Sequence, residues 1–204
     1  MGKDKSWKLN KVLKIDDDQL KTPKHDELCL WVDNNIERLL YGILMVHAGT
    51  SPKGAYTFLG TNGVKDGITT RTHFQLDWEE PIKGYNNFII GIPDFKYSIL
   101  HREKWVNMDG GNVSRTWLFG GHIEVKPTIR SIGETMRQLK LYRSQFINPQ
   151  GEPYRHGQDA FKYSDYCFEQ FRYNLCIVTH STEYKSLFEK QGFFYITPKI
   201  EEKQ

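Results

Sequence analysis

The feature that most constrains the fold of this chain is a pair of long apolar segments separated by a turn signal. Residues 86–100 and 115–126 are rich in β-branched and aromatic side chains, which favour strands. Between them, Asp109-Gly110-Gly111 is typical turn sequence. We therefore predict two long strands that flank a hairpin loop.

A helix is predicted soon after this hairpin. Ser131 and Glu134 match a capping box, in which the serine hydroxyl accepts from a backbone amide and the glutamate side chain reaches back. Asn148-Pro149 is expected to end the helix. Apolar residues recur at steps of three and four, so that one helix face packs on the sheet: Ile132, Met136, Leu139, Tyr142 and Phe146.

The remaining elements follow from the same signals. We expect a helix at 27–47, strands at 54–60, 68–78, 175–179 and 193–197, and a helix at 182–190. Residues 150–165 are expected to form a loop that covers one edge of a site. The predicted fold class is α/β, a central mixed sheet flanked by helices.

Length and composition favour one folded domain. The chain has 204 residues, of which 38% are hydrophobic and 26% charged, so a single substantial core can form. We expect residues 1–25 to be an extended lead-in and 26–204 to be the domain. No segment reaches the roughly 18 apolar residues of a membrane span, and the expected location is the cytoplasm, that of a host cell if the protein is viral.

The cysteines exclude two kinds of site. Cys29, Cys167 and Cys176 are too few and too scattered for a disulfide framework or for a metal site made of four thiolates. We expect them to be buried thiols.

The residues that point to chemistry lie on the two long strands. Asp94 belongs to the first, and Glu124-Val125-Lys126 ends the second. Because residues i and i+2 of a strand face the same side, Glu124 and Lys126 project together while Val125 points into the core. If the strands pair, Asp94 lies beside Glu124, and the two carboxylates offer hard oxygen ligands that suit Mg²⁺ or Mn²⁺.

A divalent ion at this place would withdraw charge from a scissile phosphate and acidify a water, which Lys126 would orient. A charged pair on an exposed strand face would give the same Glu-x-Lys pattern, but residues 117–123 before it are too apolar for an ordinary edge. Gln138 and Tyr142 share one face of the following helix and can meet the ion's ligands, although packing alone would explain Tyr142.

Pro93-Asp94, Glu124-Val125-Lys126 and Gln138-x-x-x-Tyr142 together resemble the PD-(D/E)xK nuclease superfamily, and the last spacing is similar to that of its RecB-like branch. The superfamily's core order is helix, three strands, helix, strand, as predicted here over residues 27–180. The resemblance implies a restriction-endonuclease-like fold and a Mg²⁺- or Mn²⁺-dependent deoxyribonuclease. The residues it implies are Asp94, Glu124 and Val125 for metal binding, and Asp94, Glu124, Lys126, Gln138 and Tyr142 for catalysis.

Some features depart from the superfamily pattern. The 29 residues between Asp94 and Glu124 (95–123) form a long gap, so Asp109 is a rival ligand, although its Asp-Gly-Gly context is turn chemistry. The four cysteines of cluster-bearing relatives are missing, so no iron–sulfur cluster is implied. Many members carry an acid on the first helix, for which Glu27 and Glu37 are both candidates.

Charge is compatible with a DNA partner without requiring one. The formal net charge is +3 and the pI about 8.6. Basic residues nevertheless gather around the motif, and either nucleic-acid contacts or a solvated helix face would explain them. The predicted contacts are Arg130, Arg137, Lys140 and Arg143.

Other functions have weaker support. A catalytically silent nuclease-like fold that binds nucleic acid or protein, in replication or in phage–host conflict, is the main alternative, and a homodimer is left open. A small-molecule hydrolase lacks a Gly-x-Ser-x-Gly or a Cys and His signal. His180-Ser181-Thr182 resembles half of a two-histidine phosphoesterase, but the second half is missing. We expect His73 and His122 to be structural, although His122 shares the face of Glu124.

Overall fold

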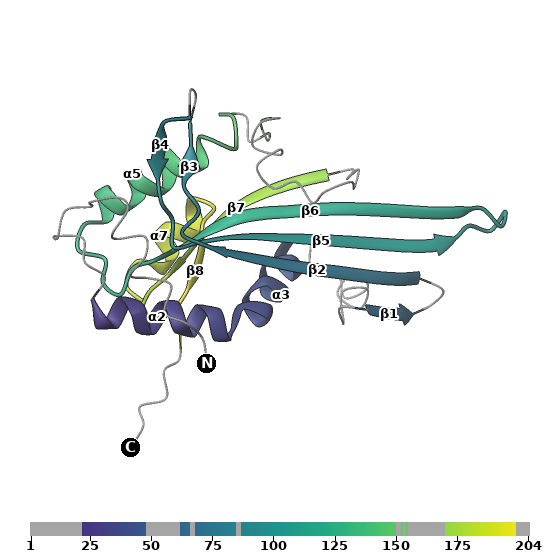
Figure 1. Ribbon diagram of the computed structural model, residues 1–204, viewed down its shortest axis with the longest axis horizontal. Helices are drawn as coiled ribbons and strands as arrows, with labels where there is room; N and C mark the ends of the chain where they lie inside the picture. The colour runs from purple at the N-terminus through teal and green to yellow at the C-terminus, as the bar shows by residue number, and fades with distance from the viewer. Residues whose placement is uncertain are drawn as a thin grey trace, which may run out of the picture.

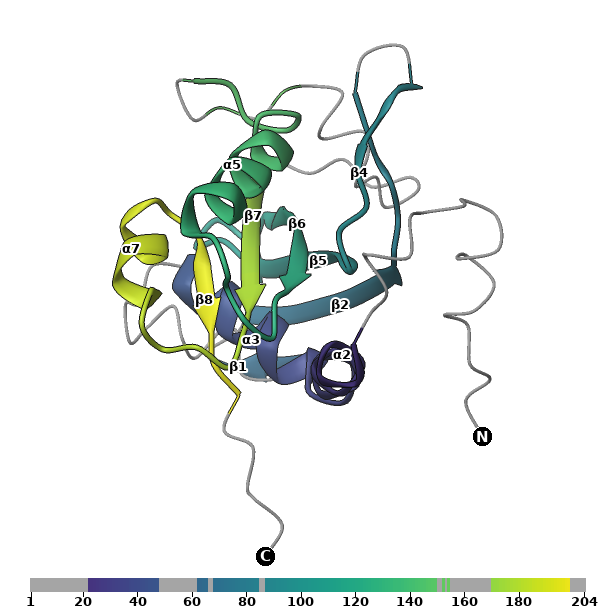
Figure 2. The same ribbon diagram turned by 90° about the vertical axis from the view of Figure 1, so that its left-hand side faces the viewer.

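The computed structural model describes residues 22–47, 62–65, 68–84, 87–149, 152, 154 and 170–198. Within these residues the chain is an α/β fold, a mixed sheet with helices on both faces (Figure 1; Figure 2). The helices are α2 (Pro23–Asn34), α3 (Ile36–His47), α5 (Ile132–Arg143) and α7 (Lys185–Lys190). The strands are β1 (Asn62–Lys65), β2 (Ile68–Trp78), β3 (Ile82–Lys83), β4 (Ile89–Gly91), β5 (Phe95–Val106), β6 (Asn112–Val125), β7 (Gln170–Val178) and β8 (Phe194–Ile196).

In the described part of the chain, the main sheet has six strands in the order β1-β2-β5-β6-β7-β8, and β3 pairs with β4 in a separate hairpin. The first four strands are antiparallel, whereas β7 and β8 run parallel to β6. The pairing of β5 with β6 runs from Phe95–Ile123 to Val106–Asn112 and closes through a turn in which Gly110 has φ +80°. The predicted hairpin of two long strands is therefore confirmed, although β6 begins at Asn112 rather than at residue 115.

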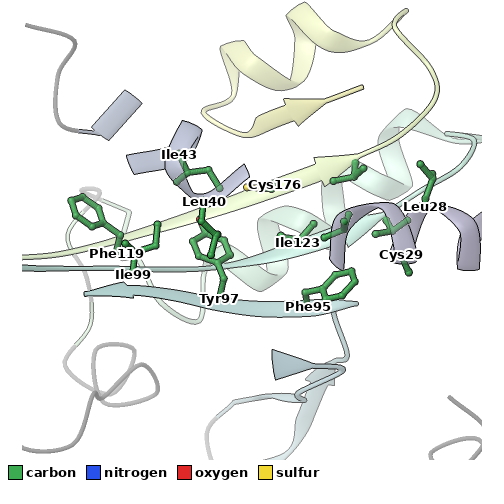
Figure 3. Close-up of a cluster of buried hydrophobic side chains, with 13 residues drawn as sticks. Leu28, Cys29, Leu40, Ile43, Phe95, Tyr97, Ile99, Phe119, Ile123 and Cys176 are labelled. Atoms are coloured by element: carbon green, nitrogen blue, oxygen red, sulfur yellow. The ribbon is translucent and has the colours of Figure 1, made fainter. Parts of the chain in front are cut away.

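Two hydrophobic clusters lie on opposite faces of the sheet. Alternate residues of β5, namely Phe95, Tyr97 and Ile99, face α2 and α3, where the cluster drawn in Figure 3 is found. The other face packs on α5 and α7 through Leu118, Leu139 and Phe188, among others. Strand β7 is buried on both faces from residue 175 to 178, as expected for a strand with parallel neighbours on both sides.

The first helix departs from its predicted bounds. It begins at Pro23, because Thr22 caps it through a bond from the His25 amide and proline suits the first helical position. The extended lead-in was predicted to reach residue 25, but residues 23–25 belong to the helix. At Asn35 the helix breaks into α2 and α3, since the Asn35 amide side chain bonds back to the Trp31 carbonyl at 2.8 Å.

Other bounds are also corrected. The strand predicted for 86–100 is interrupted after Gly91, and β5 starts anew at Phe95 and extends to Val106. Helix α5 ends at Arg143, before the predicted stop at Asn148, and α7 starts at Lys185 rather than at residue 182. The strand predicted at 54–60 and most of the loop predicted at 150–165 lie outside the described residues.

Among the described residues, no helix combines the length and the apolar character that crossing a membrane would require.

Candidate active site

The two predicted acids meet where β5 begins and β6 ends. Asp94 was predicted within a strand but lies in the bend just before β5, where its carbonyl accepts from the Glu79 amide at 3.0 Å. Its side-chain Oδ2 accepts from the Val125 amide at 2.7 Å. Because β5 and β6 are antiparallel and Phe95 pairs with Ile123, the next residues outward are Asp94 and Glu124.

Glu124 is buried and held by two donors on one of its oxygens. Its Oε1 accepts from Lys126 Nζ at 2.8 Å and from Gln138 Nε2 at 2.9 Å. The predicted alternation of side chains is thereby confirmed: Glu124 and Lys126 share one face, and Val125 is in the core. The second oxygen, Oε2, is buried and has no hydrogen-bond partner in the described part of the chain. A buried carboxylate oxygen without a hydrogen bond lowers the free energy of unfolding, and its lone pairs are available to bind a cation.

Burial and the proximity of Asp94 change the proton affinity of Glu124. Burial and the nearby charge of Asp94 raise the pKa of Glu124 from 4.5 to about 7, against the opposing effects of Lys126 and Gln138. For Lys126, burial acts to lower the pKa, but the charge and hydrogen bond of Glu124 outweigh it, so the pKa is raised. Lys126 therefore stays charged at neutral pH, while Glu124 titrates near neutrality.

Gln138 and Tyr142 extend this network along α5. The Gln138 amide donates both to Glu124 and, at 2.8 Å, to the Tyr142 hydroxyl. Tyr142 also belongs to the hydrophobic cluster on this face, and a side chain added at Gly91 would collide with its ring. Tyr142 thus packs against β4, as the packing explanation predicted, and it also contacts the polar network through Gln138. A role of Tyr142 toward the ligands of an ion stays a prediction.

The rival acid Asp109 is far from this place. It lies in the turn at the other end of the hairpin, where its side chain accepts from the Gly111 amide at 3.3 Å. Strand β5 is 12 residues long, so at about 3.3 Å per residue Asp109 is roughly 40 Å away along the strands. The structure brings Asp94, and not Asp109, to Glu124.

The residue from the first helix that reaches the site is His25, which the sequence reasoning missed. His25 Nε2 lies 3.1 Å from Asp94 Oδ1. Glu27 on α2 and Glu37 on α3, the two acids proposed for this role, are both exposed. The available signal was Thr22-Pro23, because a helix that starts there places His25 in its first turn.

Val125 was predicted to take part in metal binding, and it can do so only through its backbone, because its side chain is apolar. Its side chain is buried in the cluster beneath α2, and its amide already donates to Asp94. This bond ties the end of β6 to the bend before β5. It fixes the orientation of the Asp94 carboxylate relative to Glu124.

The predicted basic contacts divide into two groups. Arg130, Arg137 and Lys140 are exposed. Arg143 is partly buried, and its Nη1 donates to the Gln191 carbonyl at 3.1 Å, which connects α5 to the end of α7. Arg143 therefore has a structural contact that the sequence did not predict.

Of the other histidines and cysteines considered above, His122, Cys29 and Cys176 are buried. His122 is buried and lies 2.8 Å from the Tyr173 hydroxyl, and burial together with Lys96 lowers its pKa to about 3. It is a neutral core histidine despite sharing the face of Glu124. His73 is exposed. Cys29 and Cys176 are buried thiols, as expected, and Cys167 lies outside the described residues.

The residues present fit a divalent cation. Two neighbouring carboxylates repel each other, which the raised pKa of Glu124 reflects, and a cation between them would remove this repulsion. Glu124 Oε2 supplies an oxygen ligand of the kind that Mg²⁺ and Mn²⁺ prefer.

Comparisons with models of known protein families, with curated proteins and with solved structures found no match. What the chain does is therefore inferred from the residues of the site.

Proposed function

We propose that this chain is a Mg²⁺- or Mn²⁺-dependent nuclease that hydrolyses phosphodiester bonds in DNA on a restriction-endonuclease-like core. The observation that carries the proposal is the buried Asp94–Glu124 pair, with Lys126 and Gln138 bonded to one oxygen of Glu124. The order of elements supports it, since α2 and α3 are followed by β2, β5 and β6, then by α5 and β7. A phage or mobile-element origin is part of the same proposal.

Each residue has a distinct task in this reaction. A divalent ion bound by the carboxylates supplies positive charge to the scissile phosphate and makes water more acidic. Asp94 and Glu124 hold the negative charge that binds it, and the Val125 amide keeps Asp94 in place. Lys126 remains protonated, so its ammonium orients the attacking water and offsets charge that develops on the phosphoryl oxygens.

The surface beside the site suits a phosphate backbone. Arg130, Arg137 and Lys140 are exposed near Lys126 or on α5, whose residue Gln138 contacts Glu124. We propose that these three residues contact DNA phosphates. Arg143, which bonds the Gln191 carbonyl, contributes mainly to stability.

The experiment that tests the function uses the full chain with plasmid DNA and a single-stranded oligonucleotide, in Mg²⁺, in Mn²⁺ and in EDTA. Cleavage that requires either ion and stops in EDTA supports the proposal. Cleavage that is equally fast in EDTA, or no cleavage of either substrate in either ion, contradicts it.

Metal binding should also change stability in a way that depends on pH. The folded-state pKa of Glu124 is raised to about 7, so between pH 4.5 and 7 the folded chain binds more protons than the unfolded one. The contribution of Glu124 to the free energy of unfolding therefore falls as pH rises through this window. Because Mg²⁺ binds the ionised pair, it should raise the unfolding temperature by several degrees at pH 8 and by much less at pH 5.5.

This prediction is checked by thermal unfolding without DNA. Glu124→Gln is the control variant, since it should remove both the pH dependence in this window and the Mg²⁺ effect at pH 8. A Mg²⁺ effect of equal size in wild type and Glu124→Gln would mean that the ion binds elsewhere.

Loss of the Gln138 amide, which bridges Glu124 and Tyr142, is expected to reduce the cleavage rate only partly. Gln138→Ala should lower cleavage by roughly ten- to a hundredfold, the scale of losing a partner that orients a metal ligand, with little change in the unfolding temperature. Tyr142→Phe should lose less, because the ring still packs against Gly91. Wild-type rates for Gln138→Ala would show that its bonds serve the fold alone.

A further inference from the structure

A second group of metal-binding atoms lies beside the proposed active site, on the side of α2. His25 and Cys29 are one helical turn apart on the face that meets the sheet. The Cys29 sulfur lies 3.6 Å from Nδ1 and 3.9 Å from Nε2 of His25. Figure 3 shows Cys29 on the helix near Phe95, the residue that directly follows Asp94 in the chain.

Asp94 completes this group. Its Oδ2 is held by the Val125 amide, and its Oδ1 lies 3.1 Å from His25 Nε2. One ligand atom from each of His25, Cys29 and Asp94 lies within 4.8 Å of the other two. Donors around one tetrahedral zinc ion are about 3.3–3.8 Å apart, given bonds of about 2.0–2.3 Å. The observed separations at His25 Nε2, 3.1 and 3.9 Å, are close to these values.

The donor types select a class of cation. A thiolate, an imidazole and a carboxylate are a typical set for Zn²⁺ and similar transition-metal ions, whereas Mg²⁺ prefers oxygen donors and retains water. Cys29 is buried and His25 and Asp94 are largely so, which shields the site from bulk water. We propose that His25, Cys29 and Asp94 form a site for a thiophilic divalent cation of the zinc class.

Binding there changes the state of the ligands in a simple way. A metal–sulfur bond replaces the S–H bond of Cys29, and the proton goes to solvent together with any proton on His25 Nε2; no electron is transferred. Three protein ligands leave one position for water or another donor.

The shared ligand gives the site a regulatory consequence, which rests on the proposed function. Asp94 belongs both to this group and to the pair with Glu124. A zinc-class ion on Asp94 neutralises the charge that the pair needs for Mg²⁺. Its binding therefore inhibits Mg²⁺-dependent cleavage.

The site is tested without DNA, using Co²⁺ as a probe because a cobalt–thiolate bond has its own charge-transfer absorption. All proteins carry Cys167→Ser, so that Cys29 and Cys176 are the thiols compared. One Co²⁺ should bind per chain with this absorption, and Zn²⁺ should displace it. Cys29→Ser should abolish the absorption and weaken Zn²⁺ binding by at least about tenfold.

Cys176→Ser is the matched control, because Cys176 is also buried in the cluster beneath α2 and α3. It should keep the absorption. His25→Gln, at a partly exposed position, provides a second variant if Cys29→Ser does not fold, and it too should weaken Zn²⁺ binding. Absence of the absorption in the starting protein, or its persistence in Cys29→Ser, overturns the proposal.

The inhibition is measured separately, by adding Zn²⁺ to a cleavage reaction in excess Mg²⁺. The starting protein should be inhibited, and Cys29→Ser should resist the same Zn²⁺ concentration. Equal inhibition of both overturns the regulatory consequence. If the chain does not cleave DNA at all, the proposed function fails, whereas the Co²⁺ measurement still decides whether the zinc-class site exists.

Discussion

Asp94→Asn and Glu124→Gln are each expected to lower Mg²⁺-dependent DNA cleavage on the order of a thousandfold or more, with the fold retained. Each substitution keeps the size of the side chain but removes one of the two charges proposed to bind the ion. The side-chain carbonyl oxygen introduced by Asp94→Asn can still accept from the Val125 amide, so the bend before β5 should keep its geometry.

The same substitutions should not destabilise the protein in the absence of metal. At pH 8 the wild type buries two ionised acids side by side, and Glu124→Gln removes this repulsion. Its unfolding temperature in EDTA at pH 8 should therefore equal or exceed that of the wild type. Loss of activity together with equal or higher stability is the sign of a residue retained for function rather than for folding.

Asp109→Asn is the control for these variants, because Asp109 lies at the far end of the hairpin. Its cleavage rate and unfolding temperature should match those of the wild type. If Asp109→Asn is inactive and Asp94→Asn cuts normally, the assignment of the ligand is wrong. If both Asp94→Asn and Glu124→Gln cut at the wild-type rate, the nuclease proposal is wrong.

Lys126→Ala is expected to reduce cleavage by about a hundred- to a thousandfold through a different cause. Lys126→Ala removes the ammonium that is proposed to offset charge developing on the phosphate, but it leaves both acids in place. Lys126→Ala also removes the positive charge that stabilises ionised Glu124, so the pKa of Glu124 should rise further. The increase of the unfolding temperature by Mg²⁺ at pH 8 should persist, unlike in Glu124→Gln.

Lys140→Ala is the matched control for this variant, since Lys140 is an exposed lysine on α5. It should weaken DNA binding modestly and alike for all sequences, without a large loss of the cleavage rate at saturating DNA. Cleavage rates at saturating DNA separate the two variants. A loss in Lys140→Ala as large as that in Lys126→Ala would place the catalytic cation on α5.

Local patterns predicted the elements that surround the site. The turn at Asp109-Gly110-Gly111 and the apolar segments on either side led to the β5–β6 hairpin, which the register confirms. Ser131 led to the start of α5, where its hydroxyl accepts from the Glu134 amide at 3.3 Å. These signals act over a few residues, so a single sequence contains all that is needed to recognise them.

Where neighbouring signals competed, the prediction was wrong by a few residues. Thr22-Pro23 is compatible with an extended segment, although the same pair caps a helix and starts it. The break at Asn35 was not predicted, because an asparagine within an otherwise helical pattern interrupts it only if its side chain finds a backbone partner. That partner is visible only once the chain is folded.

The sequence by itself determined that Glu124 and Lys126 share a face, because alternation along a strand depends on nothing beyond the strand. Only the tertiary structure decided between Asp94 and Asp109, since that choice depends on the register of two strands whose paired residues are far apart in sequence. It also brought His25 to Asp94 in place of Glu27 or Glu37, through the packing of α2 on the sheet. The raised pKa of Glu124 was likewise decided only by the tertiary structure, because burial and the neighbouring charge of Asp94 exist only in the folded chain.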